Sequence, residues 1–381
     1  MDVDNAVAEF LEVKRKRVPA TLQVHYSDFN RLYDLKLWHQ LTLKVEEFTR
    51  IPEAGPYLIP LYEHFVSDWE KKVSQVKFVL IALAVARQYH DFKQALEFMD
   101  SIMAKVDTPE TQDAYVLALM EAGHFQLLLG NLEGTATALE KGEKILDGFN
   151  TVDPVIHASF YRVSADFNKA KADFGQYYKN ALLYLACITL DDMAVAEKVE
   201  RAHDLALAAL LSDKIYNFGD LLMHPILESL KGTEHAWLGD ALHIFNTGSI
   251  AKYDVLSGNF AKESILQSHA AFLRQKICLM TLIEILFKRI SVSRRMTFED
   301  VAKETRLNIE EVEHLVMKAL SLGLIKGHID QVDQVINIQW VQPRYLDRNQ
   351  IREMANQLAQ WEDKVGTIIS SMEAEAPSLF A

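Results

Sequence analysis

Cysteine, glycine and proline are all scarce in this 381-residue chain. Its two cysteines, Cys187 and Cys278, lie far apart, which excludes a disulfide framework and a four-cysteine zinc site. Free thiols fit a reducing compartment, and we expect the protein in the cytoplasm and the nucleus. The 15 glycines and 9 prolines are few for this length and favour long helices over sheets rich in turns.

Positive charge and long apolar runs are also scarce. The chain has 40 Lys and Arg against 53 Asp and Glu, a formal net charge of −13, which argues against a dedicated binder of nucleic acid or of an anionic membrane. The longest apolar run, at residues 78–86, is about half of the ~20 residues that a membrane-spanning helix needs. One short basic run, KRKR at residues 14–17, is compatible with nuclear import, although a solvated helix end explains it more simply.

The sequence motifs of common catalytic and cofactor sites are missing. The chain contains no phosphate-binding loop, dinucleotide-binding fingerprint, Gly-x-Ser-x-Gly nucleophile elbow, His-Glu-x-x-His motif or His-x-His pair. Its 13 histidines are scattered, and pairs such as His235 and His243 have no acid at a spacing that completes a recognised metal site. We therefore expect no enzymatic activity, no cofactor and no metal ion.

Short polar segments that interrupt the helical stretches recur along the chain. Each break carries Gly, Asp or Asn between two apolar helical stretches, and the four breaks lie at residues 89–98, 129–139, 173–184 and 216–227. They align, at steps of 41, 45 and 41 residues, on Ala95, Ala136, Ala181 and Leu222. Each period is predicted to be a helical hairpin, and such hairpins stack into an α-solenoid of degenerate, TPR-like repeats.

Residues 297–316, TFEDVAKETRLNIEEVEHLV, predict two short helices joined by a tight turn. Thr297 can cap the first helix, and Asn308 with Glu311 forms a capping-box pattern at the start of the second, which Gly323 ends. Two strand-like runs follow, at residues 324–329 and 335–340. The unit is thus predicted to be a helix-turn-helix followed by a two-stranded wing.

The charges of this unit argue against DNA binding. A helix that reads DNA presents its first turns to the phosphates, but here those turns carry Glu310, Glu311 and Glu313. Residues 291–340 contain six Lys or Arg against eight Asp or Glu, whereas DNA-binding domains carry a basic patch. The unit is therefore predicted to bind protein, and we expect the wing strands at residues 324–329 and 335–340 to offer an open backbone edge to a neighbour's sheet.

A narrow heptad seam runs along the last predicted helix. Its apolar residues recur at alternating steps of three and four, and they are Ile351, Met354, Leu358, Trp361, Val365, Ile368 and Met372. Such a seam needs a partner helix. The partner is predicted to be another chain, and the alternative is that the helix folds back on its own solenoid.

The order of these parts, and above all the stretch MTFEDVAKETRLNIEEVEHLVMKALSLGLIKGHIDQVDQVINIQWVQPRYLD, resembles the PCI-domain subunits of the proteasome lid. The resemblance covers the whole chain. It implies a non-catalytic scaffold whose winged-helix domain lies beside those of neighbouring PCI subunits, and whose C-terminal helix joins a bundle that organises lid assembly. It also implies that the solenoid contacts neighbouring subunits and the ubiquitin-receptor subunit.

These observations together define what we expect. The fold is mainly α, an α-solenoid of TPR-like hairpins followed by a winged-helix (PCI) domain and a C-terminal heptad helix. Its expected segments are N-terminal helices at 1–70, the solenoid at 71–270, the winged helix at 271–343, and the C-terminal bundle helix and tail at 344–381.

The expected function is that of a structural and assembly subunit of the 26S proteasome regulatory particle lid, which supports ATP-dependent degradation of ubiquitinated proteins. The expected partners are other PCI and MPN subunits in a hetero-oligomer, with neither nucleic acid nor membrane among them. A PCI subunit of the signalosome or of translation initiation factor three is the alternative. Partner-binding residues are expected along the seam and, in the winged helix, at Glu310, Glu311, Glu313, Ile336, Ile338 and Trp340.

Overall fold

The computed structural model describes residues 2–149, 151–289, 295–343 and 348–375. The described chain is mainly helical, which confirms the predicted fold class. Contacts between elements divide it into two compact units, Met1–Asp192 and Met193–Ala381. The sequence-based division into four segments rests on repeat pattern rather than on compactness, and it stays a prediction.

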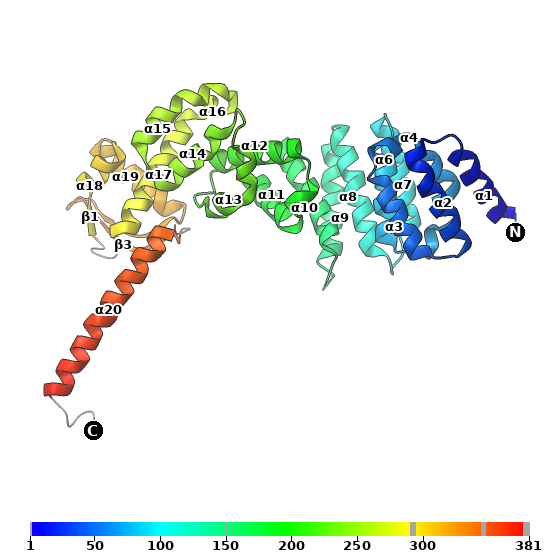
Figure 1. Cartoon of the computed structure of the whole chain (residues 1–381). Coiled ribbons are helices and arrows are strands. Elements are labelled where there is room, and N and C mark those ends of the chain that lie inside the picture. The colour runs from blue at the N-terminus through cyan, green and yellow to red at the C-terminus, as the bar shows by residue number, and fades with distance from the viewer. Residues whose placement is uncertain (1, 150, 290–294, 344–347, 376–381) are drawn as a thin grey trace. The chain divides into compact units, whose positions relative to one another are not determined.

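The first unit consists of helices joined by short turns (Figure 1). Its α-helices are α1 (Asp2–Arg15), α2 (Ala20–Asp34), α3 (Trp38–Thr49), α4 (Gly55–Leu61), α5 (Ser67–Trp69), α6 (Gln75–Ala86), α7 (Phe92–Val106), α8 (Gln112–Leu128), α9 (Leu132–Leu146), α10 (Pro154–Ala170) and α11 (Phe174–Cys187). The pairs α6–α7, α8–α9 and α10–α11 are hairpins, and α8 packs on both α6 and α10. This stacking is the α-solenoid that the recurring breaks predict.

Side-chain caps explain where the second helix of each hairpin begins. Asp91, Asn131 and Asp173 immediately precede α7, α9 and α11, and each side chain accepts a hydrogen bond from a backbone N–H of the first turn. The residue before the cap is left-handed in two of these turns, with φ of 81° at Gly130 and 57° at Ala172. The short polar breaks in the sequence are therefore helix start signals.

The second unit begins with a long helix and continues into shorter ones. Its first elements are α12 (Val195–Leu211), α13 (Gly219–Met223), the 3₁₀ helix η5 (Pro225–Leu230), α14 (Ala236–Thr247), α15 (Ile250–Leu256), the 3₁₀ helix η6 (Ser257–Lys262) and α16 (Ser264–Ser268). The fourth predicted break, aligned on Leu222, thus leads into the five-residue α13 and not into a full-length partner helix. Packing of α12 against η5 and α14 takes the place of a regular hairpin.

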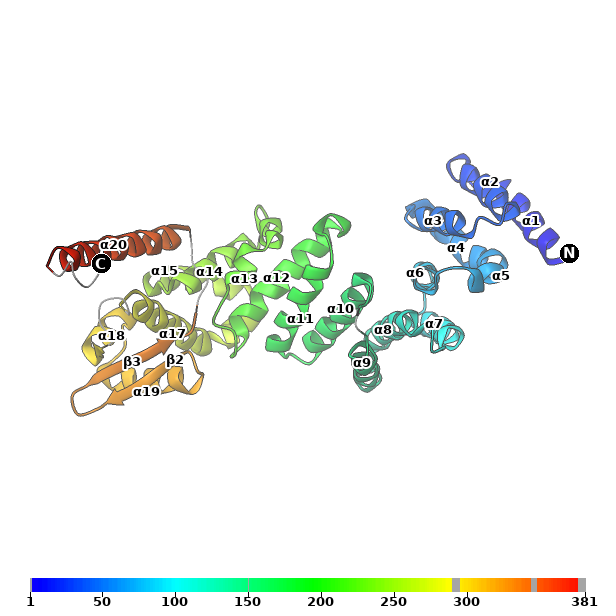
Figure 2. The ribbon, with the colours of Figure 1, turned by 90° about the horizontal axis from the view of Figure 1, so that it is seen from below.

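A winged helix follows these short helices in the second unit (Figure 2). Its elements are α17 (Ala270–Arg289), β1 (Arg295–Thr297), α18 (Phe298–Thr305), α19 (Ile309–Ser321), β2 (Ile325–Asp330) and β3 (Val335–Val341). The sheet order is β1-β3-β2, so the described sheet has three antiparallel strands where the sequence predicted two. The missed strand, β1, has only three residues and is defined by its pairing with β3 rather than by a pattern of its own.

The capping signals predicted for the winged helix are confirmed. The Thr297 side chain accepts a hydrogen bond from the backbone N–H of Asp300, and the Asn308–Glu311 capping box is present at the start of α19. Gly323 adopts φ of 69° just beyond the end of α19. Gly327 lies at the register shift in β2, where a Cβ would collide with the carbonyl oxygen of Asn337, so this position requires glycine.

Lys276 on α17 is a charged residue in the core, with 1% of its surface exposed. Its Nζ donates hydrogen bonds to the carbonyl oxygens of Ala209, Leu210 and Ser212, at 2.7, 3.1 and 2.6 Å, and so caps the C-terminal end of α12. Three aromatic rings also face the ammonium group, and they belong to Tyr216, Phe218 and Phe272. Burial lowers the pKa of Lys276 to about 7.

Candidate interaction surfaces

The heptad seam lies on α20 (Arg348–Glu375), a helix of 28 residues and thus about 42 Å long. Six of the seven seam side chains are exposed, and Val365 is half-buried. Trp361 is 66% and Leu358 61% exposed, although these residue types are usually buried. The described structure thus presents the seam as an apolar surface, and its partner-binding role stays a prediction.

The three glutamates of α19 differ in what they do. Glu311 accepts a hydrogen bond from the backbone N–H of Asn308 as part of the capping box. Glu313 accepts a hydrogen bond of 3.1 Å from the side chain of Gln331, in the turn between β2 and β3. Glu310 is exposed in the first turn. Glu310 and Glu313 are therefore the acids that can meet a partner without loss of the helix cap.

The described sheet has two edge strands, β1 and β2, and β2 is the longer of them. β3 is the central strand and pairs with β1 over Val335–Asn337. The prediction of an open backbone edge at residues 335–340 is therefore wrong for Val335–Asn337. Ile336 and Ile338 are 1% and 2% exposed and pack in the core, which corrects their prediction as contact residues. Trp340 is 39% exposed, and the Nζ of Lys326 lies 5.0 Å from the centre of its ring.

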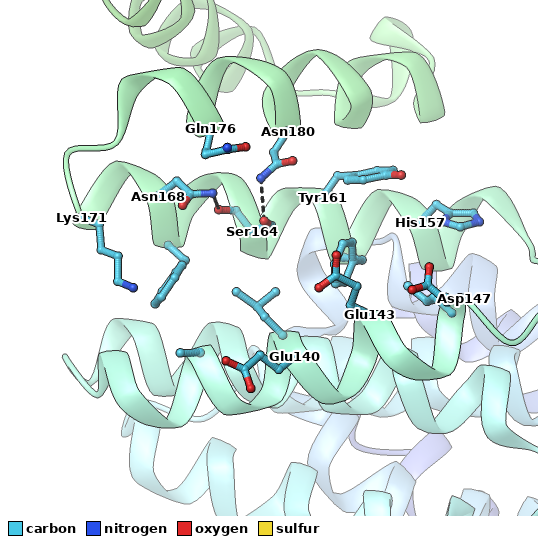
Figure 3. Close-up of a pocket in the computed structure, with 15 residues that line it drawn as sticks. Glu140, Glu143, Asp147, His157, Tyr161, Ser164, Asn168, Lys171, Gln176 and Asn180 are labelled. Carbon is cyan, nitrogen blue, oxygen red and sulfur yellow. Dashed lines mark hydrogen bonds between the residues drawn. The ribbon is translucent and has the colours of Figure 1, made fainter. Parts of the chain in front are cut away.

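A groove of about 510 Å³ separates α9 from α10 and α11 in the first unit (Figure 3). Glu140, Glu143 and Asp147 line one side, and His157 and Tyr161 line the other (Figure 3). No hydrogen bond among the described residues joins a carboxylate of this groove to His157 or Tyr161. The groove is therefore an open surface between repeats rather than an assembled acid–base site.

A buried ion pair connects two successive hairpins of the first unit. Glu121 on α8 is 3% exposed, and both of its carboxylate oxygens lie 2.6 Å from Nη2 of Arg162 on α10. The Ser159 hydroxyl donates a third hydrogen bond of 2.6 Å to Glu121. Burial raises the pKa of Glu121, but Arg162 and Ser159 outweigh it and leave the pKa below its ordinary value. The sequence alone does not reveal this pair, because its members lie 41 residues apart.

A second polar cluster, which the sequence alone does not reveal, lies in the second unit. His203 on α12, His235 just before α14 and Glu263 just before α16 place their ligand-type atoms within 4.8 Å of one another. Hydrogen bonds to Asp204 and Glu263 raise the pKa of His203 above its ordinary value. The pair considered from the sequence, His235 with His243, is not the one that the fold brings together.

Two further sequence features can be placed in the structure. Lys14 and Arg15 end α1, and the side chains of Arg15, Lys16 and Arg17 are exposed, as a solvated helix end requires.

None of the described helices is both long and apolar enough to cross a membrane.

Comparison with known families and proteins gives matches along the whole chain. The family of PSD13 N-terminal repeats matches residues 25–242, and the PCI domain family matches residues 250–340. A Schizosaccharomyces pombe protein named probable 26S proteasome regulatory subunit rpn9 is 40% identical over 100% of both chains. The Arabidopsis thaliana protein named 26S proteasome non-ATPase regulatory subunit 13 homolog B is 38% identical over 99% of this chain and 100% of its own.

A more distant similarity connects the chain to another assembly. Subunit M of eukaryotic translation initiation factor 3 from Phaeosphaeria nodorum is 23% identical over 64% of this chain and 55% of its own. This match is weaker and shorter than those to the proteasomal proteins. With PSD13 repeats followed by a PCI domain, and full-length relatives well above 30% identity, the chain belongs to the family of 26S proteasome non-ATPase regulatory subunit 13.

Proposed function

We propose that this protein is a non-catalytic scaffold and assembly subunit of the lid of the 26S proteasome regulatory particle. The observation that carries the proposal is the apolar seam of α20, exposed on a chain whose full-length relatives are named proteasomal regulatory subunits. A seam of this kind is stabilised when other helices pack on it. The protein thereby supports ATP-dependent degradation of ubiquitinated proteins without performing catalysis itself.

The winged helix supplies a second contact in this proposal. The unpaired edge of β2 can extend its sheet into a neighbouring PCI subunit, because main-chain hydrogen bonds at a strand edge supply affinity without a specific side chain. The acidic first turns of α19 suit a protein partner with complementary basic groups. The MPN subunits and the ubiquitin-receptor subunit complete the proposed partners, and the cytoplasm and nucleus are the proposed compartments.

Purification of the tagged full chain from its own cells tests the proposal. We expect proteasomal ATPases and lid subunits to co-purify in near-stoichiometric amounts. Recovery of a signalosome or of initiation factor three in their place would overturn the assignment. The distant similarity to an initiation factor subunit makes that comparison the relevant one.

The charge of α19 is tested separately with Glu310→Lys combined with Glu313→Lys, which leaves the capping residue Glu311 intact. We expect roughly tenfold weaker association with the neighbouring subunit, because two charges at the edge of an interface contribute about 1–2 kcal/mol. Titration of the reconstituted pair gives the affinity. Glu299→Lys with Glu304→Lys on α18 makes the same change in charge and should have little effect. Equal loss in both double variants would show that net charge, not α19, is what matters.

A further inference from the structure

The cluster of His203, His235 and Glu263 has the composition and spacing of a metal site, and we propose that it binds a zinc-class divalent cation. Its ligands are two imidazole nitrogens and one carboxylate oxygen, a set that suits zinc and its transition-metal neighbours better than magnesium or calcium. The site goes beyond the assembly function, since neither the seam nor the winged-helix contacts contain its residues.

The distances between ligand atoms fit one tetrahedral ion. A tetrahedral metal bonded at about 2.0–2.1 Å separates its ligand atoms by roughly 3.3–3.4 Å. Here Nε2 of His203 lies 3.1 Å, and Nδ1 of His235 3.8 Å, from Oε1 of Glu263. The two imidazole rings meet edge to face with their centres 4.4 Å apart. All three ligand atoms lie within 4.8 Å of one another, which is close to the separation that one shared ion requires.

An outer carboxylate supports the first ligand. Nδ1 of His203 lies 3.4 Å from Oδ1 of Asp204, while its Nε2 faces Glu263. A metal-bound imidazole commonly donates its other N–H to a carboxylate, which fixes the tautomer and strengthens the ligand. Asp204 is therefore a positioning residue, and Glu263 and Asp204 together provide the negative charge that a divalent ion needs.

The backbone segments that carry the three ligands are held by the core. His203 lies on α12 between the fully buried Ala202 and Leu205. The other two ligands are held by a contact between aromatic rings. The centres of the Trp237 and Phe260 rings lie 6.0 Å apart. Trp237 follows His235 by two residues, and Phe260 precedes Glu263 by three. These contacts bring the ligands together before any ion binds, so little ordering entropy opposes coordination.

The consequence of coordination is structural. The three ligands come from segments up to 60 residues apart, in the part of the second unit where regular hairpins give way to short helices. An ion here would join α12 to the starts of α14 and α16 at one point. The three side chains are 19%, 36% and 21% exposed, so water can supply the fourth ligand.

Titration of the full chain with Zn²⁺ and Co²⁺, after removal of any histidine tag and of bound metal, tests the proposal. We expect one equivalent to bind with micromolar or tighter affinity, and the Co²⁺ form to show the visible absorption of a tetrahedral site. Mg²⁺ at the same concentration should not compete. Zn²⁺ should also raise the Tm of the full chain.

Variants assign the binding to the cluster. Glu263→Gln and His203→Gln should each weaken Zn²⁺ affinity more than about tenfold, and Asp204→Asn by roughly 10- to 100-fold. His243→Gln is the matched control, since it changes an exposed histidine of α14 outside the cluster. Circular dichroism checks that each variant folds. The proposal is overturned if the wild-type chain binds no stoichiometric Zn²⁺ or Co²⁺, or if the cluster variants bind as tightly as His243→Gln.

Discussion

Trp361→Asp in α20 is expected to abolish incorporation of this chain into the lid while leaving the chain folded. Trp361 is 66% exposed, so the substitution removes little buried surface, and the free energy of unfolding should change by no more than about 0.5 kcal/mol. At the centre of a helix interface the same change places a charge where an indole ring packs. Tryptophan residues in such positions contribute about 2–4 kcal/mol to binding, so affinity should fall at least 30-fold.

Reconstitution with the other lid subunits, followed by measurement of the mass of the complexes, gives the result. Gln360→Asp is the control, because it adds the same charge one residue away on another face of α20. A chain that ends at Asp347 should behave like Trp361→Asp. Normal assembly of that shortened chain would move the binding to the wing or the solenoid and would favour the alternative in which the seam packs within the chain.

Glu121→Ala is expected to destabilise the first unit by about 3–5 kcal/mol, a much larger loss of stability than we expect for Trp361→Asp. The substitution leaves Arg162 without its carboxylate partner in a nearly buried position and removes the acceptor of the Ser159 hydroxyl. The ion pair and the hydrogen bond that are lost both join α8 to α10, the contact through which one hairpin stacks on the next. Urea unfolding followed by circular dichroism measures the change.

A double variant separates the loss of the pair from the burial of a lone charge. Glu121→Leu with Arg162→Met should recover most of the lost stability, since an apolar pair of similar volume often replaces a buried ion pair without net cost. Equal instability of the single and double variants would show that packing at this position, rather than the unpaired guanidinium, is decisive.

The lowered pKa of Glu121 sets the pH dependence of this effect. The folded state holds the carboxylate ionised at pH values where an unfolded glutamate is protonated, so the stabilisation is fully present above the ordinary glutamate pKa. It is lost as the pH falls through the lower pKa of the folded chain. The difference in stability between wild type and Glu121→Ala should therefore shrink in acid.

Most of the fold that could be predicted from the sequence was predicted from local sequence patterns. A helix start depends on a few neighbouring residues, so the Asn308–Glu311 capping box and the breaks before α7, α9 and α11 could be identified without tertiary information. The heptad steps of α20 are local in the same sense, and they correctly indicated a long helix with one apolar face.

Features that depend on residues distant in the sequence were missed or placed wrongly. β1 is defined by its pairing with β3, and that pairing removed the open edge expected at Val335–Asn337. Ile336 and Ile338, which we expected to contact a partner, lie on a face of the sheet that packs inward. The His203–Glu263 contact spans 60 residues and has no spacing that a motif could describe.

The burial of Lys276 makes its amine a reporter of opening in the second unit. Amine-specific reagents reach exposed lysines such as Lys252 and Lys262 at once, but they reach Lys276 only when the contact between α12 and α17 breaks. The rate of its acylation under native conditions therefore measures how often that contact opens. Acylation also removes hydrogen-bond donors of the amine that caps α12, so a molecule that reacts at Lys276 cannot close again in the same way. Chemical labelling at Lys276 therefore captures the open state irreversibly.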